Sequence, residues 1–254
     1  MKFGTSGLRG LVTDLQGHAS ALYATAFARH LLDAGLAKTG DRIFVAGDYR
    51  PSSPDIAATC IGALARAGLQ PIDCGAIPTP ALALYAMSKG CASLMVTGSH
   101  IPADRNGIKF YRPDGEIDKA DELAITRIAA EIGDTIVDLT PGTAQNEERQ
   151  AIELFLSRNR ALLPADALAG LKIGVYQHST VARDGLIEPA TTDGRIENGG
   201  GVAPAAANPG VVAERVMFVT AADSGVVLAH NVELPTANRA ERALVGIGVS
   251  TADP

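Results

Sequence analysis

The sequence predicts an α/β fold in which a mixed sheet lies between helices, and two observations support this. Residues 1–110 alternate short apolar runs of strand length with stretches in which apolar residues recur every three or four positions. That alternation is typical of a sheet with helices packed on its faces. The 254 residues are 46% hydrophobic and 20% charged, which is enough apolar material for a core. Because only 4% are aromatic and tryptophan is absent, we expect a core of Ala, Leu, Ile and Val.

The expected elements follow one another with turn residues between them. The helices are expected at residues 18–36, 55–67, 78–90, 118–131 and 147–160. The strands are expected at residues 42–48, 70–77, 92–96, 108–111 and 171–177. Glycine is found at or beside the end of each of the first three helices (Gly35, Gly68 and Gly90), a common helix stop.

The chain is expected to divide into four segments. Residues 1–134 form a first α/β domain, residues 135–146 a linker, and residues 147–185 the start of a second α/β domain. Residues 186–254 form an atypical low-complexity tail, which contains no lysine and is expected to be irregular. Two stretches of the tail, 216–220 and 226–229, could be strands, but no pattern sets their register.

Composition also limits the partners and the location of the protein. The net charge of −6 disfavours general binding to nucleic acid, which depends on neutralising phosphates with Lys and Arg. The sequence contains no uninterrupted apolar run of about 18 residues, so no membrane span is expected. The first ten residues lack the apolar core of a secretory signal. Cys60, Cys74 and Cys91 are too scattered for a disulfide framework and are expected to be buried thiols in a reducing compartment. The expected location is the cytoplasm.

One loop carries the residues best suited to chemistry. Ser99 lies between Gly98 and His100, directly after the expected strand 92–96, so its hydroxyl is expected to be exposed. His100 could act as a base, and Lys109 at the start of the next strand can bring an ammonium group back to the loop. Arg9 lies between flexible glycines, where backbone can approach a ligand closely. A hydroxyl with two cations and a histidine suits a serine that carries a phosphoryl group, whose negative charge must be offset.

Residues 3–10 (FGTSGLRG) and 97–109 (TGSHIPADRNGIK) together resemble the α-D-phosphohexomutases, the phosphomannomutase and phosphoglucomutase family. The resemblance covers residues 1–186 and implies that family's α/β fold for the first domain. It implies an intramolecular phosphotransferase that interconverts hexose 1- and 6-phosphates through a phosphoserine and a bisphosphate. The substrate class is then a hexose or hexosamine phosphate.

The same resemblance implies roles for individual residues. Ser99 would carry the phosphoryl group, and His100 beside it would be an acid or base. Arg9 and Lys109 would stabilise the group during transfer. The resemblance also implies Mg²⁺, with phosphorylated Ser99 as one of its ligands.

The family's Asp-Gly-Asp-x-Asp-Arg metal loop does not occur in this sequence. The nearest stretch, residues 192–195, keeps one aspartate, Asp193, which is better explained as part of a turn. An alternative is therefore a truncated, non-catalytic remnant that binds a sugar phosphate or a partner chain. A Ser-His-Asp hydrolase is disfavoured because Ser99 lacks the Gly-x-Ser-x-Gly elbow. Asp48 and Arg50 could line a cleft after strand 42–48, although an ordinary turn at the strand end is the favoured interpretation.

Overall fold

The fold was analysed in a computed structural model. It describes residues 2–3, 7–99, 101–133, 138–162, 172–174, 181, 195–196, 216–221 and 227–232.

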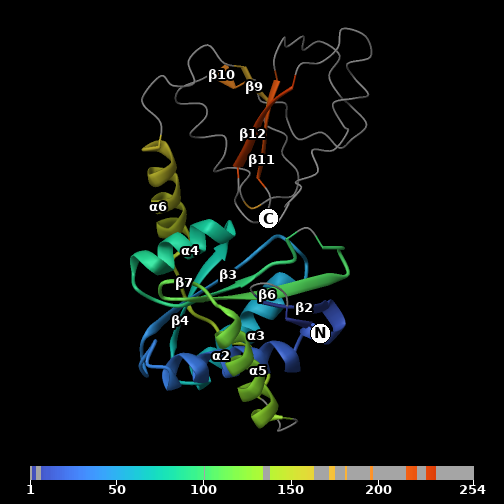
Figure 1. The fold of residues 1–254 in the computed structure, drawn as a ribbon, viewed down its shortest axis with the longest axis vertical. Coiled ribbons are helices and arrows are strands. Elements are labelled where there is room, and N and C mark those ends of the chain that lie inside the picture. Colours follow the sequence, from blue (N-terminus) through green and yellow to red (C-terminus); the bar gives the residue numbers. More distant parts are fainter. Residues whose placement is uncertain are drawn as a thin grey trace.

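A mixed eight-stranded sheet forms the centre of the first unit, as expected (Figure 1). Its strands are β1 (Lys2–Phe3), β2 (Gly7–Leu11), β3 (Arg42–Gly47), β4 (Gln70–Ala76), β5 (Ser93–Val96), β6 (Arg105–Arg112), β7 (Gly115–Glu116) and β8 (Gln145–Asn146). The order along the sheet is β1-β2-β6-β5-β3-β4-β8, with β7 paired to β6 outside this path. Strand β3 runs parallel to β4 and β5, whereas β6 runs antiparallel to β2 and β5.

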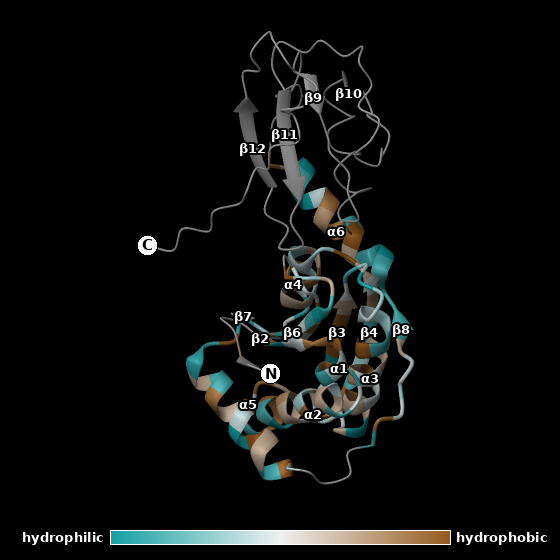
Figure 2. Cartoon of the chain, turned by 90° about the vertical axis from the view of Figure 1, so that its right-hand side faces the viewer, coloured by the Kyte–Doolittle hydropathy of each residue, from teal (hydrophilic) through white to brown (hydrophobic). Residues whose placement is uncertain are grey.

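Helices cover both faces of this sheet. They are α1 (Val12–Leu15), α2 (His18–Asp33), α3 (Ser53–Arg66), α4 (Thr79–Ser88), α5 (Lys119–Ile132) and α6 (Glu148–Arg160). Figures 1 and 2 show α2, α3 and α5 on one side of the sheet and α4 and α6 on the other. The first unit is therefore a three-layer α/β/α structure, the arrangement that the strand and helix alternation predicts.

Alternation along β3 explains why both faces are covered. Ile43 and Val45 point into the core under α2 and α3, whereas Phe44 and Ala46 point into the core under α4 and α6. Successive side chains of a strand face opposite sides of the sheet, so a fully apolar strand needs a helical layer on each side. The sequence RIFVAG therefore specifies a central strand.

Most helix bounds agree with the expected ones, and their ends have local causes. Helix α5 starts after Asp118, whose carboxylate accepts hydrogen bonds from the backbone N–H groups of Ala120 and Asp121. The Asp121 carboxylate accepts one in return from the Asp118 N–H, which completes a capping box. Helix α2 ends at Asp33, three residues before the expected end at 36, because Gly35 adopts a left-handed φ of 69° that breaks the helix.

Two features of the first unit were not expected. The opening motif forms strand β2, which pairs along its length with β6 from Gly7 opposite Lys109 to Leu11 opposite Arg105. This pairing extends β6 back to Arg105, three residues before the expected start at 108. The short helix α1 then follows β2 directly.

Residues 138–146, part of the expected linker, lie against α3. The Arg66 guanidinium donates hydrogen bonds to the carbonyls of Asp138 and Thr140, and the Gly142 N–H donates to the Ala58 carbonyl at 2.8 Å. Gly62 and Gly142 approach so closely that a Cβ on either would overlap the other's backbone. Strand β8 then joins the edge of the sheet beside β4. These contacts fix the segment to the first unit.

Helix α6 is attached to the first unit through Glu147, the residue before its first turn. The Glu147 carboxylate pairs with Arg42 at 2.5 Å and accepts a hydrogen bond of 2.7 Å from the Tyr85 hydroxyl. The hydrogen bond from Arg42 lowers the pKa of Glu147 below its usual value, despite the opposing effect of burial. Burial together with Glu147 raises the pKa of Tyr85 to about 12. The division of the chain at residue 147 stays a prediction.

A second sheet is described further along the chain. Its strands are β9 (Lys172–Gly174), β10 (Arg195–Ile196), β11 (Val216–Ala221) and β12 (Val227–Val232), in the order β10-β9-β11-β12. Strands β11 and β12, which the sequence left open, pair antiparallel from Val216 opposite Val232 to Ala221 opposite Val227. Strand β9 lies in the expected strand 171–177, and β11 runs parallel to it.

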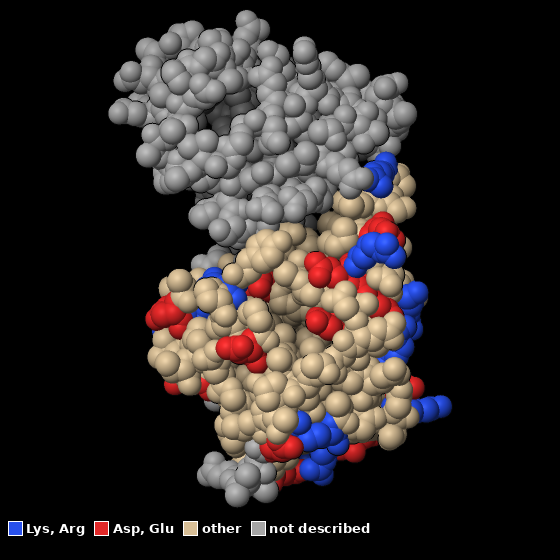
Figure 3. All heavy atoms as spheres, turned by 180° about the vertical axis from the view of Figure 1, so that it is seen from behind, with Lys and Arg blue, Asp and Glu red and all other residues tan. Residues whose placement is uncertain are grey.

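All three cysteines are free thiols, and two of the three are buried as expected. Cys60 and Cys74 are fully buried, and burial raises the pKa of each thiol to about 12. Cys91 is only partly buried, because it follows the exposed turn after α4. In the part of the chain that the structure describes, no helix is long and apolar enough to cross a bilayer. On the face shown in Figure 3, the described Lys and Arg side chains are scattered among acidic ones.

Candidate active site

Ser99 lies at the tip of a loop that joins two antiparallel strands, as expected. Strand β5 ends at Val96, and the chain returns as β6 from Arg105. Ser99 adopts a left-handed φ of 53°, and it is the one non-glycine residue of the described chain with a positive φ. For an L-residue this conformation costs about 1 kcal/mol, so surrounding contacts must hold it.

The first of these contacts comes from Thr97. The Thr97 hydroxyl accepts a hydrogen bond of 3.0 Å from the Ser99 N–H. The Thr97 N–H in turn donates to the Gly107 carbonyl at 3.0 Å, which closes the base of the loop. The strained residue is therefore tied to the point where the two strands meet.

Asp48, which follows β3, fixes the first residues of the loop by hydrogen bonds. It is only 5% exposed, and its Oδ2 accepts hydrogen bonds from the Thr97 hydroxyl at 2.9 Å and the Gly98 N–H at 3.0 Å. Its Oδ1 accepts from the Ser53 hydroxyl at 2.5 Å and the Arg50 N–H at 3.0 Å. Both carboxylate oxygens are thus engaged by the protein. A buried carboxylate needs such partners, because burying it without them would be costly.

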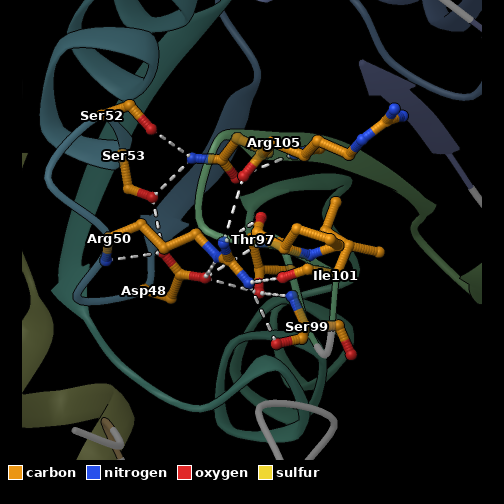
Figure 4. A network of polar contacts seen from close by, with 12 residues as sticks. Asp48, Arg50, Ser52, Ser53, Thr97, Ser99, Ile101 and Arg105 are labelled. Carbon is orange, nitrogen blue, oxygen red and sulfur yellow. Dashed lines mark hydrogen bonds and ion pairs between the residues drawn. The ribbon is translucent and has the colours of Figure 1, made fainter. Parts of the chain in front are cut away.

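Arg50 holds the rest of the loop (Figure 4). Its Nη1 donates to the carbonyls of Pro102 at 2.9 Å and Arg105 at 3.1 Å. Its Nη2 donates to the carbonyls of Ile101 at 2.6 Å and Ser99 at 3.4 Å. Its Nε faces Asp48 Oδ2 at 3.5 Å. One guanidinium therefore binds four carbonyl groups in and just after the loop. The Ser99 hydroxyl points away from the Asp48–Arg50 pair (Figure 4).

Asn106 joins this network from the first residues of β6. It is fully buried, and its side-chain NH₂ donates to the hydroxyls of Ser52 at 2.9 Å and Ser53 at 3.0 Å. Its side-chain oxygen accepts from the Gly107 N–H at 2.8 Å. Because Ser53 also donates to Asp48, the start of α3 and both ends of the loop belong to one hydrogen-bonded network.

Strand register brings Arg9 and Lys109 to the same face of the sheet. Arg9 pairs with Gly107, and Lys109 pairs with Gly7 on one side and Met95 on the other. Residues directly opposite each other, and residues two apart on a strand, share a face. Residue 107 is a glycine because a Cβ there would lie 2.9 Å from the Leu8 carbonyl oxygen and 3.0 Å from that of Thr97. Arg9 and Lys109 therefore lie on one face of the sheet, in the strands next to the base of the loop.

Not every sequence-predicted residue can be placed. His100, residues 4–6 of the opening motif, and Asp193 lie outside the described residues. Asp48 and Arg50 do follow β3 in a turn, where the Arg50 N–H donates to Asp48 Oδ1, but both also contact the Ser99 loop, which the turn interpretation does not predict. The role of Asn106 in joining the loop to α3 was not expected. The signal that could have found it is an Asn-Gly pair close after a Gly-Ser loop, with serines following Asp-x-Arg.

Comparisons with known proteins match the first unit and a short stretch beyond it. The family model described as "Phosphoglucomutase/phosphomannomutase, alpha/beta/alpha domain I" matches residues 1–135. A phosphomannomutase from Sinorhizobium fredii is 59% identical over 186 residues, which are 72% of this chain and 39% of that protein. A phosphomannomutase from Salmonella muenchen is 41% identical over 185 residues, 72% of this chain and 37% of that protein. The chain thus spans about two fifths of the length of these relatives.

A solved structure supports the fold. The crystal structure of a phosphoglucomutase/phosphomannomutase family protein from Burkholderia thailandensis aligns with a TM-score of 0.64 and 18% identity. The alignment covers 88% of this chain and 55% of that one. At this level of identity the likeness extends to the fold alone.

Proposed function

Because the chain belongs to the phosphoglucomutase/phosphomannomutase family, we propose that Ser99 carries a phosphoryl group in a phosphohexomutase reaction. This reaction interconverts hexose 1- and 6-phosphates through a phosphoserine and a bisphosphate. One observation carries the proposal: a strained serine is held at the tip of a buttressed loop whose base lies beside Arg9 and Lys109. A hydroxyl on a loop whose neighbouring strands carry two cations suits a group that gains negative charge.

The transfer can be written in terms of this chain's residues. The Ser99 Oγ forms a bond to phosphorus as the bond from phosphorus to a sugar oxygen breaks. The serine proton passes to His100 and ends on the sugar oxygen. Arg9 and Lys109 offset the charge of the phosphoryl oxygens, since phosphoryl transfer depends mainly on positioning and charge stabilisation. In the complete cycle, phosphorylated Ser99 first gives its phosphoryl group to the free hydroxyl of a hexose monophosphate, which forms the bisphosphate. After the bisphosphate turns over in the site, the transfer written above moves its other phosphoryl group back to Ser99.

The substrate class is proposed from the relatives. Two relatives are named phosphomannomutase, and others that match over shorter stretches are named phosphoglucosamine mutase. A hexose or hexosamine monophosphate is the substrate class common to those names. The buried thiols of Cys60 and Cys74 suit a reducing compartment, and we place the protein in the cytoplasm on that basis.

The family resemblance also implies Mg²⁺, and the described residues fit this ion only in part. Mg²⁺ prefers six oxygen ligands, several from carboxylates, phosphates or water. Among the residues that the structure describes, no three His, Cys, Asp or Glu side chains form a group that could hold a metal. Both oxygens of Asp48 are already engaged by the protein, Oδ2 by the loop and Oδ1 by Ser53 and the Arg50 N–H. A phosphorylated Ser99 is therefore the one ligand proposed, and no step above passes through the metal.

Intact-mass spectrometry tests the proposal. The full chain is incubated with glucose 1,6-bisphosphate and Mg²⁺, and the expected result is the gain of one phosphoryl group. Ser99→Ala should abolish the gain, whereas Ser88→Ala, at an exposed serine of α4, should leave it intact. If the mass of the wild-type chain stays unchanged at every bisphosphate concentration, this chain is not a competent carrier. A gain that persists in Ser99→Ala would place the acceptor elsewhere.

A further inference from the structure

The loop that bears Ser99 depends on a cation that is not positioned to touch a substrate. Arg50 has five N–H donors. Four hydrogen bonds to loop carbonyls and the pairing of Nε with Asp48 occupy all five directions. An arginine that binds a phosphate needs at least two donors for the bidentate contact. Arg50 has none to spare.

From this geometry we infer that Arg50 and Asp48 are positioning residues, which set the conformation of the Ser99 loop without contacting substrate. The inference rests on the proposed function for its consequence, the rate of phosphoryl loading. Its structural part stands on the contacts alone.

The two residues have separate tasks in holding the loop. Asp48 binds donors of residues 97 and 98, before the strained serine. Arg50 binds acceptors of residues 99, 101, 102 and 105, at the serine and after it. The ion pair between them joins the two sets of contacts across Ser99. The left-handed φ of Ser99 is thus enforced from both sides.

Burial strengthens this arrangement. The side chain of Asp48 is 3% exposed and that of Arg50 is 17% exposed, so water competes poorly for their hydrogen bonds. Gly98 is also required, because the guanidinium of Arg50 lies where a Cβ of residue 98 would be. A lysine at position 50 would keep the charge but could not gather four carbonyls, since its ammonium lacks the planar fork.

The Arg66 side chain provides a matched control. It also donates to two backbone carbonyls, those of Asp138 and Thr140, but on the outer side of α3. Arg50→Ala and Arg66→Ala therefore remove the same chemistry from two different segments. A change confined to the Ser99 loop in the first variant would not arise from general loss of stability.

Amide hydrogen exchange of the full chain, followed by NMR, tests the structural part. In Arg50→Ala and Arg50→Lys, exchange at the Ser99 and Ile101 amides should rise about 10-fold or more, because these N–H groups are bonded within the loop. Exchange at the Gly98 amide should rise with them, because its acceptor is the Asp48 carboxylate that pairs with Arg50. Ethylguanidinium should restore protection in Arg50→Ala, whereas ethylammonium should not. In Arg66→Ala the loop amides should keep their protection and the Gly142 amide should lose it. Unchanged loop exchange in both Arg50 variants would overturn the inference.

Loading of Ser99 from glucose 1,6-bisphosphate tests the consequence. In Arg50→Lys the maximal loading rate should fall about 10-fold or more, with the half-saturating bisphosphate concentration within about twofold of wild type. A raised half-saturating concentration with an unchanged maximal rate would show that Arg50 binds substrate, and would overturn the inference. If the wild-type chain does not load, the proposed function fails, and amide exchange alone decides whether Arg50 and Asp48 position the loop.

Discussion

The guanidinium of Arg50 fills the space beside the Cα of Gly98 that the Cβ of any other residue would occupy. The two residues lie 48 positions apart, yet each limits what the other can be. Glycine at 98 lets the arginine side chain lie against the loop backbone, where it donates hydrogen bonds to the loop carbonyls. This close approach explains why a glycine precedes the serine.

Gly98→Ala should therefore destabilise the protein by about 2 kcal/mol or more, because the new methyl group overlaps a buried guanidinium. The midpoint of urea unfolding measures the effect. Gly35→Ala is the control, because residue 35 has a positive φ but open space around it. The free energy of unfolding of this variant should fall by only about 1 kcal/mol. Equal losses in the two variants would mean that the Arg50 contact is unimportant.

Asn106→Ala should cost about 2 to 3 kcal/mol, because it removes three hydrogen bonds and leaves a buried N–H without its partner. Thermal unfolding of the variant checks this value. Asn159→Ala, which removes one hydrogen bond to the Phe155 carbonyl on α6, should cost about 1 kcal/mol or less. The prediction is wrong if Asn106→Ala unfolds at the wild-type temperature.

Gly62→Ala should lower stability even though alanine is the better helix former. Alanine in a helix interior ordinarily gains about 1 kcal/mol over glycine. At position 62 its Cβ would overlap the Thr140 carbonyl and the Gly142 N–H. Thr126→Ala, at an exposed position of α5, should gain a few tenths of a kcal/mol. A gain in the melting temperature of Gly62→Ala would show that residues 138–142 are not held against α3.

Glu147 should make the stability of the protein depend on acid pH. Its pKa is lowered in the folded chain by the hydrogen bond from Arg42, whereas the unfolded glutamate titrates near 4.5. The resulting stabilisation is complete above the unfolded pKa and is lost as the pH falls through the folded pKa. The stability difference between wild type and Glu147→Gln should be constant near neutral pH and shrink below pH 4.5. Urea unfolding at several pH values measures it, and a difference that grows on acidification would contradict the pairing.

The layered fold could be predicted from the sequence because buried residues recur at the regular spacing of strands and helices. Residues 43–46 are apolar on both faces, and that pattern alone indicates a central strand under two helical layers. The capping box at Asp118 is equally local. Ser99 could be found because its strand, loop and glycines lie next to one another in the chain.

The contacts by which Asp48 and Arg50 hold the Ser99 loop could not be predicted in the same way. Arg50 reaches Ile101 across 51 positions, and Asp48 reaches Gly98 across 50. Such contacts depend on β3 and β5 being neighbours in the sheet, which strand patterns do not specify. An Asp-x-Arg after a strand therefore reads as a turn until the sheet order is known.

Release of the phosphoryl group from Ser99 tests the central claim most directly. The chain is first loaded from glucose 1,6-bisphosphate, and the modified residue is located by peptide mapping. Mannose 6-phosphate or glucose 6-phosphate is then added, and the products are followed by ³¹P NMR. A carrier should hold the group on Ser99 and lose it as a hexose bisphosphate forms. A group that stays on Ser99 in the presence of either sugar phosphate, or that is found on another residue, would contradict the account.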